Sequence, residues 1–252
     1  MRKEDAVRRY FEDSKVVSDY ERATRDLGLW LSEERICSRV FKKEDAILDL
    51  GCGSGRIAFG LYDLGYRNLI GVDFSEEMVT AARRIGSKLG CPIPFRKGDA
   101  TALEFEDELF EGVIFGFNGL MQIPKAAQRF KAMCECARII TQGGFFVFTT
   151  HDRDRSPHSR YWTEEAARWT RGEQSEEKEI FGDRLEHFEC GMHFMHVPSR
   201  EEVEELVEKS GLRVEATTMR SELVTEPYSI QKFSDNCRFW ITQKVAPTPN
   251  SD

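Results

Sequence analysis

A glycine-rich turn, Ile47-Leu-Asp-Leu-Gly51-Cys-Gly53-Ser-Gly55-Arg56, constrains this sequence more than any other segment. It follows an apolar run and precedes a stretch with apolar residues at helical spacing, so we predict that it joins a strand to a helix. Glycines let the backbone turn tightly and approach a ligand, and the start of a helix offers free N–H groups. A dinucleotide-binding turn would have a third glycine where this chain has Arg56. The turn therefore predicts a small-molecule site at the end of a strand and argues against a nicotinamide-binding oxidoreductase.

Short apolar runs alternate with amphipathic stretches from about residue 46 onwards. The runs at 47–50, 69–72, 113–117 and 145–149 have the character of strands buried on both faces, as in a parallel sheet. A third strand is predicted to end at Asp99, and two more at 212–218 and 238–242. Helices are predicted after Ser75, a suitable N-cap, and from Pro124 to Gly143-Gly144. We therefore predict an α/β, Rossmann-like, doubly wound domain over residues 46–245, with a seven-stranded, mostly parallel sheet.

Two regions do not follow this alternation. Residues 1–45 are amphipathic, and we predict that they form an N-terminal helical cap. Residues 151–197 interrupt the pattern between a strand and a helix, and we predict an inserted segment that covers the substrate site. Residues 246–252 are predicted to be a disordered tail.

Acidic residues end the first three predicted strands. Asp49 precedes the glycine turn, where a carboxylate suits a cationic group better than a pyrophosphate. Asp73 lies 73 − 51 = 22 residues after Gly51, the spacing at which a carboxylate accepts hydrogen bonds from ribose hydroxyls. Asp99 is placed to accept a hydrogen bond from an exocyclic amine. Three acids at one edge of a parallel sheet, beside a glycine turn, indicate a nucleoside-binding pocket.

The sequence resembles the class I S-adenosylmethionine-dependent methyltransferases over about residues 45–242. The segment 49–55 looks like their first motif, 71–75 like the ribose-binding step and 97–100 like the adenine-binding step. Segments 110–123 and 143–148 are similar to their fourth and fifth strands. Two positions depart from the family pattern: Glu111 stands where Asp is usual, and Gln122 where His is usual. The second departure argues against histidine-based catalysis at that position.

The resemblance implies S-adenosylmethionine as cofactor and S-adenosylhomocysteine as product. The backbone of the glycine turn would approach the methionine end, with Asp49 near its ammonium, and Asp73 would take the ribose hydroxyls. Phe74 and Met78 would flank the adenine, with Asp99 and Ala100 at its edge. The residues implied as cofactor-binding are Asp49, Gly51, Cys52, Gly53, Asp73, Phe74, Met78, Asp99, Ala100, Asn118 and Gly119, the last two facing the sulfonium.

Two side chains are candidates for catalysis. His151 directly follows the fifth predicted strand, so it is placed to act as a base or to contact the acceptor. Tyr20, in the predicted cap, could close over the cofactor and contact the sulfonium. No metal site is predicted, because His193 and His196 would point to opposite faces of a strand.

The charge balance limits the acceptor classes. The chain has 36 Lys and Arg against 44 Asp and Glu, which gives a net charge of −8 and argues against DNA as a partner. The three arginines within 151–160 are the only sequence support for an RNA or protein acceptor, so we predict a small-molecule acceptor methylated on O or N. A methyltransferase of tRNA or protein, and a module that binds the cofactor without catalysis, remain as alternatives. The lack of an apolar leader or membrane segment, with an odd number of cysteines, predicts a cytoplasmic protein.

Overall fold

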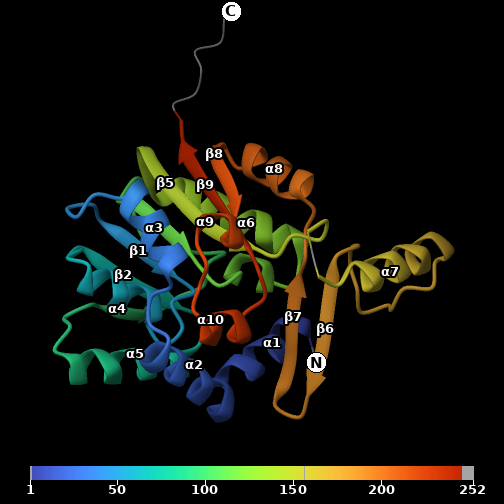
Figure 1. Cartoon of the computed structure of the whole chain (residues 1–252), viewed down its shortest axis with the longest axis horizontal. Helices are drawn as coiled ribbons and strands as arrows, with labels where there is room; N and C mark the ends of the chain where they lie inside the picture. Colours follow the sequence, from blue (N-terminus) through green and yellow to red (C-terminus); the bar gives the residue numbers. More distant parts are fainter. Residues whose placement is uncertain (1, 156, 246–252) are drawn as a thin grey trace, which may run out of the picture.

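The computed structural model describes residues 2–155 and 157–245, and its centre is a seven-stranded sheet (Figure 1). The strands are β1 (Ile47–Leu50), β2 (Leu69–Asp73), β3 (Phe95–Lys97), β4 (Phe110–Phe115), β5 (Ile140–Thr150), β8 (Leu212–Met219) and β9 (Arg238–Lys244). Their order is β3-β2-β1-β4-β5-β9-β8, and only β9 runs antiparallel to its neighbours. The predicted fold is therefore confirmed. The order reverses between β1 and β4, which is where open α/β sheets bind ligands.

Helices cover both faces of the sheet (Figure 1). They are α3 (Leu31–Val40), α4 (Arg56–Asp63), α5 (Glu76–Leu89), α6 (Ala126–Ile139) and α8 (Arg200–Lys209), with short turns η1 (Gly119–Gln122), α9 (Arg220–Leu223) and α10 (Tyr228–Phe233). As predicted, Ser75 caps α5, accepting a hydrogen bond from the Met78 N–H at 3.2 Å. Burial of apolar side chains against the sheet, rather than propensity alone, stabilises such helices.

One predicted helix end is wrong. Helix α6 stops at Ile139, and Gly143 and Gly144 lie inside β5, where the pairing with β4 shifts register. Gly143 has a φ of +81°, and a Cβ on Gly144 would lie 2.8 Å from the Glu111 carbonyl oxygen. The two glycines therefore permit a β-bulge with close backbone approach, not a helix stop.

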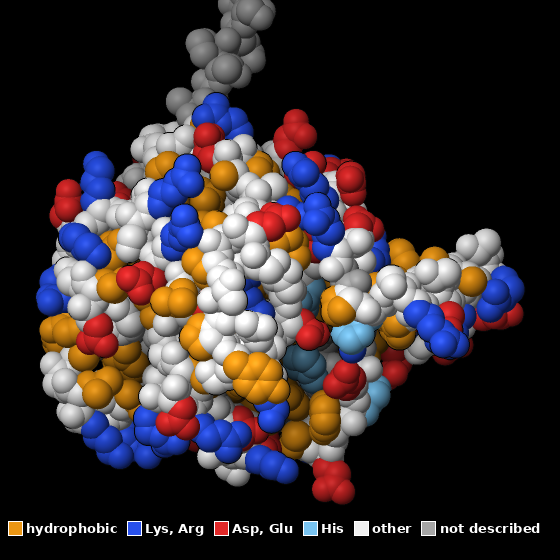
Figure 2. All heavy atoms as spheres, viewed as in Figure 1, with side chains coloured by type: hydrophobic (Ala, Val, Ile, Leu, Met, Phe, Trp, Pro, Cys, Tyr) orange, Lys and Arg blue, Asp and Glu red, His pale blue; other side chains and the backbone are white. Residues whose placement is uncertain are grey.

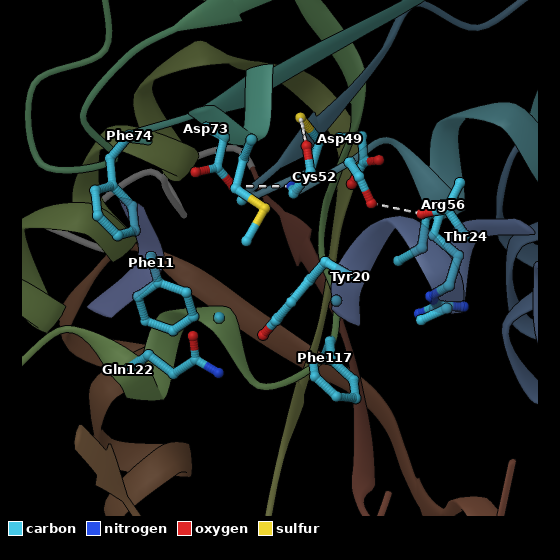
Figure 3. A pocket seen from close by; sticks show the side chains of 18 of the residues that line it. Phe11, Tyr20, Thr24, Asp49, Cys52, Arg56, Asp73, Phe74, Phe117 and Gln122 are labelled. Atoms are coloured by element: carbon cyan, nitrogen blue, oxygen red, sulfur yellow. Dashed lines mark hydrogen bonds between the residues drawn. The ribbon is translucent and has the colours of Figure 1, made fainter. Parts of the chain in front are cut away.

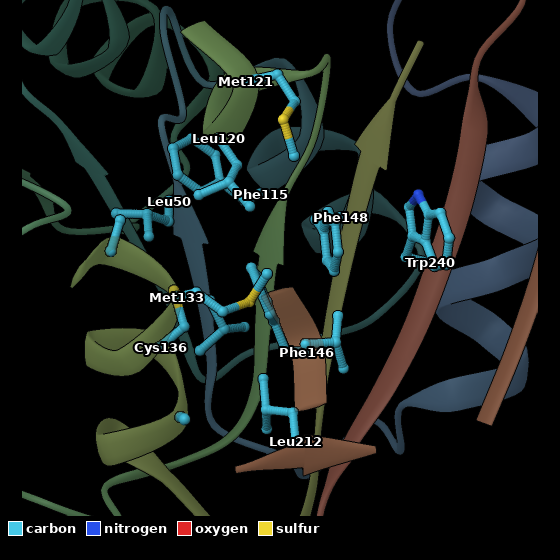
Figure 4. Close-up of a cluster of buried hydrophobic side chains, with 14 of the residues drawn as sticks. Leu50, Phe115, Leu120, Met121, Met133, Cys136, Phe146, Phe148, Leu212 and Trp240 are labelled. Carbon is cyan, nitrogen blue, oxygen red and sulfur yellow. The ribbon is translucent and has the colours of Figure 1, made fainter. Parts of the chain in front are cut away.

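The core lies on both faces of the sheet because successive residues of its central strands are buried on opposite faces. Phe146 and Phe148 point to one face, with ring centroids 4.9 Å apart, and Phe148 stacks on Trp240 at 6.1 Å. Figure 4 shows these rings beside Met133 and Cys136 of α6. Val147, between the two phenylalanines, belongs to the core of the opposite face. This double burial fixes the carboxyl ends of β1, β2 and β4, which carry the site.

The N-terminal segment and the insertion pack on each other. Helices α1 (Lys3–Glu12) and α2 (Ser14–Asp26) cover the carboxyl end of the sheet, and α1 lies against the hairpin of β6 (Asp183–Phe188) and β7 (Gly191–His196). A Cβ on Gly191 would lie 2.5 Å from the Ala6 carbonyl oxygen, so a glycine permits this approach. Helix α7 (Ser159–Arg171), also within the insertion, projects away from the body instead (Figure 1). The predicted tail, 246–252, lies outside the described residues.

None of the helices within 2–155 and 157–245 combines the length and the apolar character that a bilayer crossing requires.

Candidate active site

The glycine turn forms the floor of a cavity at the carboxyl ends of β1 and β2. Gly51 and Gly53 have φ values of +64° and +54°, a region that favours glycine. A Cβ on Gly51 would lie 2.5 Å from the Phe115 ring, and one on Gly53 would lie 3.3 Å from the Tyr20 ring. The turn therefore needs glycine both for its conformation and for its close contacts.

The cavity is lined from two sides, as Figure 3 shows. Asp49, Cys52 and Asp73 lie on the strand side, and Tyr20 reaches in from α2 toward the glycine turn. Side chains from the cap, from the end of β4, from η1 and from α10 form the opposite side: Phe11, Phe117, Gln122 and Phe233. The site therefore combines segments that lie far apart in the sequence.

Asp73 ties the turn to the neighbouring helix. Its carboxylate accepts hydrogen bonds from the Gly53 N–H at 2.8 Å and from the Ser75 N–H at 2.9 Å. Burial raises its pKa to about 6, although these backbone hydrogen bonds oppose the shift. A carboxylate oxygen has more than one lone pair, so Asp73 can still accept hydrogen bonds from a ligand.

Asp49 is buried at the end of β1, with only 2% of its surface exposed. It accepts a hydrogen bond from the Ala58 N–H of α4 at 3.0 Å. Burial raises its pKa to about 7, with the Ala58 N–H and the Arg56 charge acting in the opposite direction. A cationic ligand group would stabilise the ionised form of this carboxyl group.

A second cavity adjoins the first and shares Phe11, Phe74, Gly119 and Gln122 with it. It contains Asp99 and Ala100, just after β3, and is bounded on the other side by α1. The Asp99 carboxylate accepts hydrogen bonds from the Thr101 N–H at 2.9 Å and hydroxyl at 2.8 Å. The two cavities together form one elongated site. The Asp73 carboxylate lies in its first part and the Asp99 carboxylate in its second.

Eleven of the thirteen side chains or glycines predicted for the site line these two cavities. The first cavity holds Tyr20, Asp49, Gly51, Cys52, Gly53, Asp73, Phe74, Met78 and Gly119, and the second adds Asp99 and Ala100. Asn118 and His151 do not line either cavity. The structure therefore brings together almost the whole predicted set.

Asn118 and His151 lie behind the wall of the first cavity. Asn118 is buried, its N–H donates to the Thr149 hydroxyl at 2.8 Å, and its Nδ2 lies 3.3 Å from His151 Nε2. His151 Nδ1 lies 3.3 Å from the Asn236 carbonyl oxygen, to which it donates, so Nε2 accepts from Asn118. Burial lowers the pKa of His151, which favours the neutral imidazole. His151 itself lines a separate small cavity with Arg184 and Asp235.

Arg56 links the glycine turn to the cap. The sequence predicted no such role, because Arg56 was noted only for standing where a dinucleotide-binding turn has glycine. Its guanidinium binds Glu33 of α3 through two bonds of 2.5 and 2.6 Å, and it lies 4.4 Å from the Trp30 ring centroid. Thr24 of α2 and Ser54 of the turn share a hydroxyl hydrogen bond of 2.6 Å. No local sequence pattern predicts these contacts, because Glu33, Trp30 and Thr24 lie in the cap, far from the turn in the sequence.

Within the described part of the chain, no group of three or more His, Cys, Asp or Glu side chains is placed to hold a metal ion. His193 is directed toward the aromatic rings of Tyr10 and Phe11, and His196 toward Asp183 at 2.9 Å. These two histidines therefore serve the packing of the hairpin.

The sequence matches known methyltransferases. Residues 47–144 match a family model described as "Methyltransferase domain". Over 103 residues the chain is 37% identical to a 2-phytyl-1,4-naphtoquinone methyltransferase of Synechocystis sp., covering 39% of this chain and 42% of that protein. Over 87 residues it is 29% identical to the human eEF1A lysine and N-terminal methyltransferase, covering 34% of this chain and 12% of that protein. The chain thus spans less than half the length of either relative.

Solved structures with a similar fold are also methyltransferases. An S-adenosylmethionine-dependent methyltransferase from Methanosarcina mazei superimposes with a TM-score of 0.67 at 18% identity, covering 84% of this chain and 98% of that one. Strand order, switch-point site and matched domain define a class I methyltransferase fold. Residues 47–144 therefore form a methyltransferase domain, and the chain has the fold of the S-adenosylmethionine-dependent methyltransferases.

The family implies S-adenosylmethionine as the cofactor, and the site fits it. Gly51 and Gly53 of the turn line the first cavity together with Asp49 and Asp73, so a ligand there meets both the turn and the two carboxylates. Asp73 and Asp99 present carboxylates in neighbouring cavities, where ribose hydroxyls and an amine could donate to them.

Proposed function

We propose that this protein transfers a methyl group from S-adenosylmethionine to an oxygen or nitrogen of a small-molecule acceptor. The observation that carries the proposal is the pair of joined cavities beside the glycine turn, with Asp73 and Asp99 at their strand edges. The cofactor, when bound, supplies a methyl group on a positively charged sulfur, and transfer then depends mainly on alignment with the acceptor.

The cofactor-binding roles follow the two cavities. In the first, the backbone of Gly51, Cys52 and Gly53 would hold the methionine end, with Asp49 near its ammonium group. Asp73 would accept hydrogen bonds from the ribose hydroxyls. The adenine would lie between Phe74 and Met78 and extend into the second cavity, toward Asp99 and Ala100. Gly119 would face the sulfonium, with Asn118 behind it.

The two catalytic candidates take different roles in this proposal. Burial raises the pKa of Tyr20, with the nearby charge of Asp73 adding to the shift, so its hydroxyl keeps its proton at neutral pH and acts as a donor. His151 reaches the site only through Asn118, so it acts by positioning that amide. Proton transfer from the acceptor to a base is not required when the acceptor arrives unprotonated.

A small acceptor fits this chain better than a polymer. Side chains of the cap helices line both cavities, and acidic and basic side chains alternate over the face in Figure 2. The three arginines within 151–160 are all paired with acidic side chains: Arg153 with Glu202, Arg155 with Glu222 and Arg160 with Glu164. The naphtoquinone methyltransferase relative, by its name, acts on a small molecule, whereas the eEF1A methyltransferase, by its name, acts on a protein. The seven free cysteines support a cytoplasmic location.

The test is a transfer assay with methyl-labelled S-adenosylmethionine. We expect label in a low-molecular-mass product from a panel of hydroxyl and amine acceptors, and none with the Asp73→Ala variant. Label in tRNA or protein fractions alone would support the first alternative. Cofactor binding without transfer to any fraction would support the non-catalytic module.

A further inference from the structure

The first cavity is too small for the part of the cofactor that is assigned to it. Its volume is about 70 Å³, against about 350 Å³ for the second cavity. An apolar cavity of about 150 Å³ holds benzene, which is much smaller than the methionine and ribose portion of S-adenosylmethionine. The cofactor can therefore occupy the first cavity only if one of its walls moves outward.

Helix α2 is the wall that takes up this space. Tyr20, Ala23 and Thr24 of the helix line the first cavity, and Figure 3 shows Tyr20 reaching into it. The Tyr20 ring lies over the glycine turn, since a Cβ on Gly53 would lie 3.3 Å from it. The Thr24 and Ser54 hydroxyls share a hydrogen bond of 2.6 Å. These contacts cover the backbone to which the methionine end of the cofactor is assigned.

Helix α2 is held to the rest of the protein by few contacts. Among its thirteen residues only Val17 and Ala23 are buried. An ion pair between Glu21 and Arg84 joins the helix to α5, but these side chains are 23% and 54% exposed, so the pair stabilises the contact only weakly. The strand ends on the other side of the cavity are buried on both faces of the sheet. When the cavity widens, α2 is therefore the wall that moves.

The backbone has a joint at each end of α2. Asp13, between α1 and α2, is extended, with φ −69° and ψ 131°. Gly28, after α2, has a φ of +58°, and a Cβ there would have no neighbour within 4 Å. The chain is fixed directly after this joint, because the Gly28 carbonyl accepts a hydrogen bond from Arg56 at 2.9 Å and Leu29 packs on Gly60. Since α1 packs on the β6–β7 hairpin, α2 can move while α1 and α3 stay in place.

We propose that α2 is a gate, and that its contact with the glycine turn and the binding of the cofactor exclude each other. This inference rests on the proposed function, which places the methionine end in the first cavity. With the gate closed, Tyr20 and the hydrogen bond between Thr24 and Ser54 cover the turn. When α2 swings outward about Asp13 and Gly28, the turn is uncovered and the cavity widens. The cofactor favours the open arrangement because it binds only there.

A reversible tether tests the gate. Thr24→Cys combined with Ser54→Cys places two thiols where the hydroxyls are 2.6 Å apart, so a disulfide can form with little backbone movement. S-adenosylhomocysteine is titrated calorimetrically into the variant oxidised with oxidised glutathione, and into the same protein after reduction with dithiothreitol. We expect the oxidised form to bind at least about thirtyfold more weakly than the reduced form. Binding by the oxidised form within about threefold of the reduced form would overturn the inference.

The reverse experiment uses the same variant and makes the test independent of damage by oxidation. Saturating S-adenosylhomocysteine should slow formation of the disulfide at least about tenfold, because the bound ligand holds α2 away from the turn. An unchanged rate of disulfide formation would contradict the inference. The unmodified protein, which has seven free cysteines, is taken through the same oxidation as the control, and peptide mass spectrometry identifies the bonded pair.

A single substitution keeps the inference testable if the tethered variant does not fold. Thr24→Ala removes the hydrogen bond to Ser54 that opposes opening, so we expect it to bind S-adenosylhomocysteine about fivefold more tightly. Ser18→Ala is the matched control, since Ser18 is on the same helix, is exposed and does not line the cavity. Unchanged or weaker binding in Thr24→Ala would contradict the inference alone. Failure of the unmodified protein to bind S-adenosylhomocysteine would instead contradict the proposed function beneath it.

Discussion

Replacing Arg56 with Met tests the link between the glycine turn and the cap. The Arg56 and Glu33 side chains are only 10% and 6% exposed, and they form two bonds of 2.5 and 2.6 Å. Removing the guanidinium leaves the Glu33 carboxylate buried with a single remaining hydrogen bond, from the Trp30 N–H at 2.9 Å. The variant also loses the contact of Arg56 with the Trp30 ring at 4.4 Å.

Breaking one side of a buried ion pair costs about 3–5 kcal/mol. A chain of this size loses about 2–4 °C of Tm per kcal/mol, so we expect Arg56→Met to lower Tm by roughly 6–20 °C. Because most of that cost comes from the unpaired charge, the double variant Glu33→Met with Arg56→Met should recover more than half of the loss. Differential scanning calorimetry at pH 7 measures all three proteins.

Two results would refute this reasoning. A loss of less than about 3 °C in Arg56→Met would mean that the pair is solvated in solution, as surface ion pairs are. A double variant no more stable than the single one would mean that the stabilisation comes from packing against Trp30, not from charge pairing.

Three further predictions concern the site itself. Asp73→Ala should weaken cofactor binding, measured by calorimetry, at least about 100-fold, because two charge-assisted hydrogen bonds to the ribose are lost. A change of less than about tenfold would contradict the ribose-binding role of Asp73. Asp49 and Asp73 have pKa values of about 7 and about 6 in the folded state, above the ordinary 3.8. The folded state therefore binds more protons than the unfolded state in this range. As a result, the contribution of these two carboxyl groups to the free energy of unfolding falls as pH rises from about 4 to 7. In urea unfolding, Asp49→Asn should therefore gain at least about 1 kcal/mol relative to the unmodified protein between pH 5 and 8, and a constant difference would contradict the raised pKa. Tyr20→Phe should lower turnover about tenfold with cofactor affinity within about threefold; unchanged turnover would assign Tyr20 to packing alone.

The fold could be predicted because its signals are local. Apolar strands, the Ser75 cap and the turn beginning at Gly51 each depend on a few neighbouring residues. The bulge at Gly143 and Gly144 could not be told from a helix stop, since glycine suits both and the deciding contact is with Glu111 of another strand.

The strand side of the site could also be predicted, whereas its opposite wall could not. The wall depends on how the cap, the end of β4 and α10 meet, and nothing in the sequence near Phe233 or Phe117 indicates that they stack. The partner of His151 is Asn236, 85 residues further along, so the direction of that imidazole is set by tertiary contacts. Phe117 and Asn118 have φ values of 49° and 60°, which end β4 at Phe115, two residues earlier than predicted.

Calorimetric titration with S-adenosylmethionine, S-adenosylhomocysteine and NAD tests the central claim most directly. The account predicts micromolar binding of both sulfur compounds, about −8 kcal/mol, and no binding of NAD. Binding of NAD, or failure to bind either sulfur compound, would contradict the assignment of the glycine turn and its carboxylates to this cofactor.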